Sequence, residues 1–204
     1  MSEADRKKWE ERYRKRTTEP LGPPDPFLDE ILDQLPATGC AMDLAGGSGR
    51  HALVLARHGL EVTLTDVAPA GLAIARDAAA AAGLSLHTEI IDLDSDPLPP
   101  GPFAVVFCSW FLPPDERWQD IGNLLSPDGL LVLVHPTREN LERHAHPSAR
   151  FCVDEHDLAA HLKSAGLRIR KATAGWDAAG KHTLRILAEP TEPTGPTSPA
   201  GQRA

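Results

Sequence analysis

The sequence predicts an α/β fold: a doubly wound, mostly parallel seven-stranded sheet with an antiparallel hairpin at its C-terminal end. Three observations support this fold class. Short apolar runs alternate with helix-periodic segments over residues 27–166, which is typical of a parallel sheet covered by helices. The run FAVVFCSWF (103–111) is apolar throughout, as expected of a strand that is buried on both faces. The strand-like runs 167–175 and 182–189 are separated by a short connection, which favours a hairpin at the sheet edge.

The two ends of the chain differ in composition from the part between them. Residues 1–26 hold a charged helix, over about Glu3 to Arg16, and the proline-rich stretch EPLGPPDP, which breaks it because proline removes backbone donors. Residues 189–204 are rich in proline and threonine and have little to bury, so we expect a disordered tail. Residues 27–188 therefore form the predicted domain.

The elements of this domain follow from apolar periodicity and from glycine or proline breaks. In order, they are helix 27–35, strand CAMDLA (40–45), helix 51–59 with Gly59 as its C-cap, strand EVTLTDV (61–67), helix 70–83, strand 84–93, strand 103–111, helix 116–126, a turn at 127–129, strand LLVLVH (130–135), helix 154–166 and the terminal hairpin.

Composition and charge exclude several classes of function. The net charge of −8 disfavours a protein that binds along nucleic-acid phosphates. No apolar run approaches the length of a membrane-spanning helix, and the charged N-terminal residues do not resemble a secretory signal. Cys40, Cys108 and Cys152 are odd in number and widely spaced, as in reduced cytoplasmic proteins. We expect a cytoplasmic monomer or weak dimer with no nucleic-acid or membrane partner.

A glycine-rich loop follows the first strand, in MDLAGGSGRHA (42–52). Such a loop lets the backbone approach a ligand, while the next helix presents its free N–H groups. Residues 47–52 satisfy the G-x-G-x-x-G/A dinucleotide fingerprint, a weak signal by itself. Asp66 ends the second strand, where an acid accepts hydrogen bonds from ribose hydroxyls. Neither feature distinguishes a dinucleotide from another adenosine cofactor.

Two further acids favour a cationic ligand. A negative charge on Asp43, just before the loop, suits a ligand with an ammonium and a sulfonium better than a pyrophosphate. Asp92 ends the third strand, where its carboxylate can accept a hydrogen bond from an exocyclic amine. With Asp66, these acids fall at the carboxyl ends of three successive strands, the edge at which open α/β sheets bind ligands. The alternative for each acid is an ordinary solvated residue at a strand end.

Four motifs in order resemble the class I S-adenosylmethionine-dependent methyltransferases, specifically the tellurite-resistance and thiopurine methyltransferase-like group. AMDLAGGSGRHALVLAR (41–57) is similar to that group's ALDLxCGxGRxxxxLAxxG, although Ala45 stands where the wider class often has glycine and Gly46 where the group often has cysteine. EVTLTDVAPAGLAIAR, Asp92-Leu93 and LLSPDGLLVLV are similar to its later motifs. The resemblance spans about residues 9–188 and implies a Rossmann-like methyltransferase fold and S-adenosylmethionine as cofactor.

The resemblance also implies roles for the matching residues. The methionine moiety would lie against Asp43 and the loop, the ribose against Asp66, the adenine against Asp92, and the transferable methyl above Cys108 and Ser109. WEERY (9–13) resembles a WxxRY element in which Trp9, Arg12 and Tyr13 close over the cofactor; simple docking of this helix on the domain is the alternative. The expected cofactor-binding residues are Trp9, Tyr13, Asp43, Leu44, Ala45, Gly46, Gly47, Gly49, Asp66, Val67, Asp92, Leu93, Cys108 and Ser109.

Substrate specificity is expected after the strand LLVLVH, in HPTRENLERHAHPSARFCVDEH (135–156). His135 is the candidate catalytic base, with a rim histidine as the alternative. Cationic side chains such as Arg143 would attract a small anionic acceptor. Trp110 is a candidate pocket wall, or a core residue. The histidines and Cys152 lack the spacing of a standard metal site, so we expect no metal.

Three functions are compatible with the sequence. The favoured one is an enzyme that transfers a methyl group in line from S-adenosylmethionine to a small molecule, with a soft nucleophile such as a thiol or a chalcogen oxyanion as acceptor. The second is an NAD(P)-dependent oxidoreductase, which rests on the dinucleotide fingerprint alone. The third is a non-catalytic cofactor-binding domain of the same fold.

Overall fold

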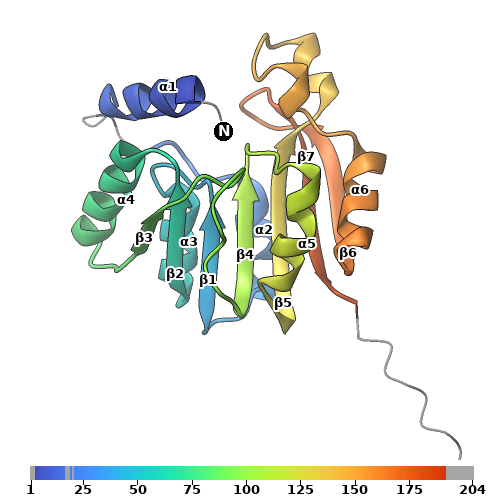
Figure 1. The fold of residues 1–204 in the computed structure, drawn as a ribbon, viewed down its shortest axis with the longest axis horizontal. Helices are drawn as coiled ribbons and strands as arrows, with labels where there is room; N and C mark the ends of the chain where they lie inside the picture. The colour runs from blue at the N-terminus through green and yellow to red at the C-terminus, as the bar shows by residue number, and fades with distance from the viewer. Residues whose placement is uncertain (1–2, 17–18, 20, 192–204) are drawn as a thin grey trace, which may run out of the picture.

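The computed structural model describes residues 3–16, 19 and 21–191 of the chain. Seven strands form one sheet in the order β3-β2-β1-β4-β5-β7-β6, with helices on both faces (Figure 1). The strands are β1 (Cys40–Leu44), β2 (Glu61–Asp66), β3 (His87–Ile90), β4 (Phe103–Ser109), β5 (Leu125–Pro136), β6 (Leu167–Trp176) and β7 (His182–Pro190). The helices are α1 (Glu3–Arg14), α2 (Pro26–Ile31), α3 (Arg50–His58), α4 (Pro69–Ala81), α5 (Trp118–Asn123) and α6 (Glu155–Ser164), with 3-10 turns η1 (Leu32–Gln34), η2 (Asp115–Arg117), η3 (Arg138–Glu142) and η4 (Ala149–Phe151).

The predicted fold class is confirmed by the sheet. Strands β1 to β5 pair in parallel, whereas β7 runs antiparallel to both β5 and β6. Because the order reverses between β1 and β4, the crevice expected to bind a ligand in open α/β sheets lies at the carboxyl ends of these strands. Among the described residues, no helix is long and apolar enough to cross a membrane.

Two apolar clusters hold the helices against the sheet. One contains side chains of α2, α3 and α4, including Phe27, Leu55 and Leu72, packed on one face of the central strands. The other packs α5 and α6, through Trp118 and Leu162, on the opposite face. Helix α1 contributes no buried residue to either cluster and lies above α4 and the carboxyl ends of β2 and β3 (Figure 1).

Several predicted boundaries differ from the structure. Strand β3 ends at Ile90, so Asp92 lies two residues beyond it rather than at its last position. The predicted turn 127–129 lies inside β5: Phe103 pairs with Leu125 and Val105 with Leu130, so the turn residues form a bulge between these pairs. Strand β7 continues to Pro190 and includes two residues assigned to the tail. Residues 192–204 lie outside the described residues.

Candidate functional site

The glycine loop joins β1 to α3 at the carboxyl edge of the sheet. Gly47 has a φ of 59°, and its N–H donates to Asp66 Oδ2 at 2.9 Å. A β-carbon on Gly47 would overlap the hydroxyl of Tyr13, which shows how closely α1 approaches the loop. Gly49, also left-handed, precedes the first residue of α3. The loop therefore takes a backbone path that requires glycine at its closest contact.

Asp43 is fully buried beneath this loop. Its Oδ2 accepts a hydrogen bond from the N–H of Ala52 at 3.1 Å, while its Oδ1 has no hydrogen-bond partner among the described residues. Burial raises the pKa of Asp43 to about 8, with a further contribution from the charge of Asp66. The carboxyl is therefore mostly protonated at neutral pH, and carries less charge than the sequence argument assumed. An unpartnered buried oxygen is a position at which a ligand cation gains a hydrogen bond.

Asp66 anchors both the glycine loop and the start of α4. Its Oδ2 accepts from Gly47, and its Oδ1 accepts from the N–H of Ala68 at 2.8 Å. Burial raises the pKa of Asp66 to about 6, against the opposing effect of these two hydrogen bonds. Asp66 therefore holds the glycine loop in place through its own side chain. The predicted contact of Asp66 with a ribose stays a prediction.

Asp92 is buried at the same edge, after β3. Its Oδ1 accepts from the N–H of Asp94 at 3.1 Å, and its Oδ2 lies 3.4 Å from Nε of Arg6 in α1. Burial acts to raise the pKa of Asp92, but hydrogen bonds and the charge of Arg6 leave it below its ordinary value. This acid stays ionised, unlike Asp43.

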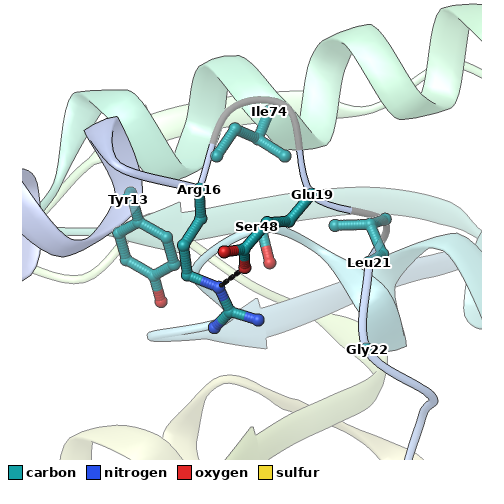
Figure 2. A pocket seen from close by; sticks show the side chains of 7 residues that line it. All are labelled: Tyr13, Arg16, Glu19, Leu21, Gly22, Ser48 and Ile74. Atoms are coloured by element: carbon teal, nitrogen blue, oxygen red, sulfur yellow. Dashed lines mark hydrogen bonds and ion pairs between the residues drawn. The ribbon is translucent and has the colours of Figure 1, made fainter.

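Helix α1 lies on top of these acids. Glu10 Oε2 accepts from the N–H of Ala70 at 2.9 Å, at the start of α4. Tyr13 is packed against the loop, and Trp9 stacks beside it with ring centroids 6.0 Å apart. Tyr13 borders a small pocket together with Arg16 and Ser48 (Figure 2), and the volume of this pocket is about 10 Å³. In this conformation α1 covers the loop closely and leaves little space beneath it.

The end of β4 carries three predicted residues in different settings. Cys108 is buried and donates to the carbonyl of Phe111 at 3.3 Å, and burial raises the pKa of its thiol. Ser109 is 9% exposed. Trp110 is half-buried with a φ of 59°, a strained conformation for a bulky residue that is found mainly at functional positions. The chain thus turns sharply where β4 reaches the edge.

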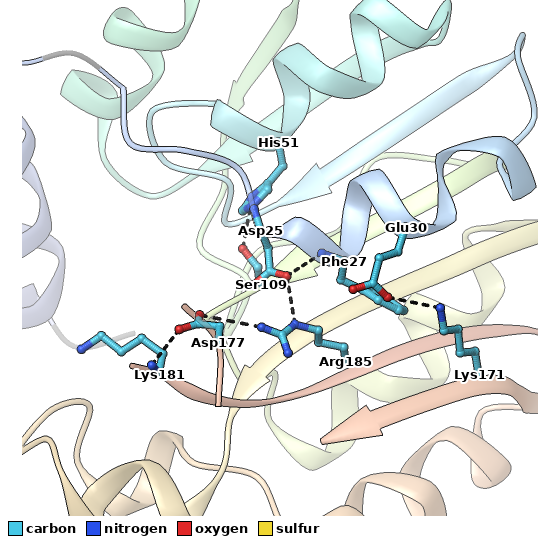
Figure 3. A network of polar contacts seen from close by, with 9 residues as sticks. All are labelled: Asp25, Phe27, Glu30, His51, Ser109, Lys171, Asp177, Lys181 and Arg185. Atoms are coloured by element: carbon cyan, nitrogen blue, oxygen red, sulfur yellow. Dashed lines mark hydrogen bonds and ion pairs between the residues drawn. The ribbon is translucent and has the colours of Figure 1, made fainter. Parts of the chain in front are cut away.

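A polar network that the sequence did not predict includes Ser109 at the end of β4 (Figure 3). His51, the second residue of α3, has Nε2 3.1 Å from the N–H of Asp25 and Nδ1 3.3 Å from Oγ of Ser109. Asp25 Oδ1 accepts from Phe27 N–H and from Nε of Arg185, both at 3.0 Å. The histidine in GSGRHA was the available signal, but nothing in the sequence shows that it meets residues 25 and 185.

The remaining predicted substrate residues are not gathered at one point. His135 is fully buried, and neither ring nitrogen has a hydrogen-bond partner among the described residues. Burial lowers its pKa to about 4. The guanidinium of Arg143 lies over the ring of Trp176, the last residue of β6, at 3.8 Å. The imidazole of His135 is therefore neutral at pH 7 and could accept a proton. No atom of it is exposed to a substrate in this conformation.

Of the other predicted residues, Leu44 and Leu93 are buried in the apolar cluster of α5 and α6. Ala45, which has a φ of 51°, Gly46 and Val67 are half-buried along the same edge. Within the described residues, no three His, Cys, Asp or Glu side chains group as a metal site. The three cysteines are free.

A larger cavity, of about 640 Å³, lies at the opposite end of the strands. It is lined by residues from the amino ends of β1, β2 and β3, among them Cys40, Glu61 and His87. Neither the loop nor the three acids line it, so it is separate from the site described above.

Comparison with known proteins agrees with this geometry. Residues 41–129 match the family of methyltransferase domains. No curated protein matches the sequence significantly. Three solved structures share the fold. TehB from Haemophilus influenzae is 16% identical, with a TM-score of 0.69 over 90% of this chain and 67% of TehB. A TehB-like SAM-dependent methyltransferase from Corynebacterium glutamicum is 17% identical, with a TM-score of 0.65 over 93% and 100% of the two chains.

The third is magnesium protoporphyrin IX methyltransferase from Synechocystis with bound SAH, which is 15% identical with a TM-score of 0.71 over 92% and 99% of the chains. These likenesses cover nearly the whole described domain, whereas the family match covers the part that holds the loop and the three acids. Residues 41–129 are thus similar to the family of methyltransferase domains, and the chain shares the Rossmann-like fold of these methyltransferase structures.

Proposed function

We propose that this protein is an S-adenosylmethionine-dependent methyltransferase whose acceptor is a small, soft, anionic nucleophile, such as a thiolate or a chalcogen oxyanion. The observation that carries the cofactor assignment is Asp43, a buried acid with an unpartnered oxygen directly beneath the glycine loop. An ammonium group donates to that oxygen and displaces the carboxyl proton, whereas a pyrophosphate is compatible only with the protonated, donating form of the carboxyl. The methyltransferase match over residues 41–129 supports the same choice over an oxidoreductase.

Each residue would have a defined task towards the cofactor. Asp43 would accept from its ammonium, Asp66 from its ribose hydroxyls, and Asp92 from its adenine amine. When bound, the cofactor supplies an electrophilic methyl on a sulfonium, so the protein mainly aligns the acceptor and excludes water. Cys108 keeps its proton because burial raises its pKa, so it does not compete as a nucleophile.

Charge and the enclosure of His135, the predicted base, support this acceptor class. A thiolate or oxyanion needs no proton removed, which fits a site where His135 is enclosed. Arg143 and its neighbours in residues 138–150 add positive charge above the edge. We further infer a cytoplasmic monomer or weak dimer without nucleic-acid or membrane partners, from the net charge and the free cysteines.

Titration calorimetry with S-adenosylhomocysteine tests the proposal, with NAD as the parallel ligand. We expect S-adenosylhomocysteine alone to bind and, at pH 7, to release close to one proton, because its ammonium lowers the raised pKa of Asp43. Repeating the titration in two buffers of different ionisation enthalpy measures that proton. Asp43→Asn should release none and bind about tenfold more weakly or worse.

The alternatives give different results in the same experiment. Binding of NAD alone would favour the oxidoreductase. No binding of either ligand would favour a non-catalytic domain. Binding of S-adenosylhomocysteine without proton release would keep the cofactor but remove the assigned role of Asp43.

We propose also that α1 acts as a lid, because Tyr13 and Glu10 rest on the loop and on the start of α4. Tyr13→Ala should raise both the association and dissociation rates of S-adenosylhomocysteine severalfold and weaken its affinity, which stopped-flow measurement can show. Lys8→Ala, on the exposed side of the same helix, is the matched control. Unchanged rates in Tyr13→Ala would mean that α1 only docks on the domain.

A further inference from the structure

The hydrogen bonds of His51 fix which of its nitrogens carries the proton. Nε2 faces the backbone N–H of Asp25 at 3.1 Å, and an N–H can only donate, so Nε2 must be the acceptor. Burial lowers the pKa of His51 to about 3, so the ring is neutral and its single proton is on Nδ1. Nδ1 faces Oγ of Ser109 at 3.3 Å. His51 therefore donates to Ser109.

This arrangement leaves the hydroxyl proton of Ser109 available. Its oxygen accepts from His51, and no described residue accepts from the hydroxyl. Ser109 is the last residue of β4 and retains 9% exposure, at the edge where the glycine loop lies. His51 itself is held in place by Phe107, with ring centroids 4.5 Å apart. A buried imidazole thus occupies an acceptor position of the serine oxygen and leaves its hydroxyl proton free to be donated.

The surroundings of this hydroxyl favour a negative ligand. The charge of Arg50 acts on Tyr13, Asp43 and His51, so its guanidinium lies near the site. No hydrogen bond or ion pair joins Arg50 to another described residue, and it is the first residue of α3, where the helix N-terminus adds partial positive charge. Asp43 is mostly protonated before the cofactor binds, and once the cofactor's ammonium has displaced that proton the ammonium itself balances the charge of Asp43.

We propose that Ser109 binds an anionic oxygen of a ligand at the carboxyl end of β4, and that His51 is the positioning residue that directs the hydroxyl towards it. The proposal deepens the proposed function and rests on it. Two sources offer the same chemistry: the carboxylate of the cofactor's methionine moiety and an oxyanion acceptor. The tests below separate them.

The tautomer can be read without any ligand. In protein labelled with ¹⁵N at histidine, the two-bond ¹H–¹⁵N spectrum should show a protonated Nδ1 and a bare Nε2 for His51, still neutral at pH 5. His51→Asn identifies the signals. A protonated Nε2, or a ring that titrates near pH 6.5, would overturn the proposal even if the cofactor binds.

Binding to Ser109→Ala tests the hydroxyl itself. We use S-adenosylhomocysteine, 5′-methylthioadenosine, which lacks the amino-acid part, and sodium selenite added to protein saturated with S-adenosylhomocysteine. A loss of about tenfold for S-adenosylhomocysteine but not for methylthioadenosine identifies the carboxylate as the source. The same loss for selenite identifies the acceptor. Ser164→Ala, a surface serine on α6, should change nothing.

Two substitutions of His51 separate positioning from packing. Asparagine keeps a donor near the place of Nδ1, so His51→Asn should retain most of the affinity. Glutamine places its carbonyl near Nε2 but offers no donor to Ser109, so His51→Gln should lose as much as Ser109→Ala. If wild type binds S-adenosylhomocysteine and all three variants bind both it and selenite equally well, the proposal is wrong while the proposed function stands. If wild type binds none of the three probes, the proposed function itself fails.

Discussion

Arg185→Leu is expected to lower the free energy of unfolding by about 3–5 kcal/mol, because it leaves the buried carboxylate of Asp25 without its cation. The two side chains are only 10% and 7% exposed, and Nε lies 3.0 Å from Oδ1. The guanidinium also faces Asp177 Oδ2 at 3.7 Å, so one substitution leaves two acids uncompensated (Figure 3). Urea denaturation followed by tryptophan fluorescence measures the change.

A surface ion pair nearby provides the matched control. Lys171 and Glu30 lie 3.3 Å apart, with side chains 38% and 54% exposed. Solvent screens such a pair, so Lys171→Ala should change the stability by less than about 1 kcal/mol. A similar loss from both substitutions would mean that burial does not set the strength of the Asp25–Arg185 pair. Asp25→Asn should be less damaging than Arg185→Leu, because the amide oxygen still accepts a hydrogen bond.

His135→Leu is expected to stabilise the protein, most strongly in acid. Both ring nitrogens are buried without partners among the described residues. A buried unpaired donor destabilises the folded wild type by about 1–3 kcal/mol, and the substitution removes this penalty at neutral pH. The folded pKa is about 4, below the ordinary 6.5, so the unfolded chain binds more protons between these values. Stability therefore falls in wild type as the pH drops from about 6.5 towards 4, by about 3 kcal/mol, and the variant avoids this loss.

Comparing the two proteins at each pH isolates this histidine. Asp43 and Asp66 have raised pKa values, so their protonation stabilises the folded state as the pH falls, but equally in both proteins. Ser164→Ala, at an exposed position on α6, removes no titratable group and is the control, so it should show no pH-dependent difference. A variant that loses stability at pH 7 would show that His135 has a partner the static contacts miss. If His135→Leu is stable but, unlike the wild type, cannot methylate an acceptor that carries a proton, His135 would be the catalytic base after all.

Local patterns were sufficient to predict most of the sheet. Apolar runs such as 103–111 and 130–135 are buried strands, and the glycine that stops α3 at Gly59 is a left-handed cap. The bulge in β5 was not predicted, because Pro127 and Gly129 are typical of a turn. The same residues also occur where the pairing of two strands continues on both sides of a bulge, as it does here between β4 and β5. Its register depends on Phe103, a residue of another strand.

The site was predicted unevenly for a similar reason. Asp43, Asp66 and Asp92 were placed correctly at one edge, since parallel strands bring their carboxyl ends together. The protonation of Asp43 was not predicted. Its pKa is raised by burial, and that burial depends on segments distant in the sequence that pack around it. His51 was missed because its partners, Asp25 and Ser109, come from separate segments and carry no motif of their own.

The pairing of Asp25 with Arg185 joins residues 160 positions apart, and this separation matters while the chain is being made. At ordinary rates of synthesis, Arg185 leaves the ribosome on the order of ten to thirty seconds after Asp25. Contacts so distant in sequence also close late in folding, since the intervening chain loses entropy first. Until β7 docks, Asp25 lacks the guanidinium that pairs with it, so the support beneath His51 is completed only after the C-terminal hairpin has been made.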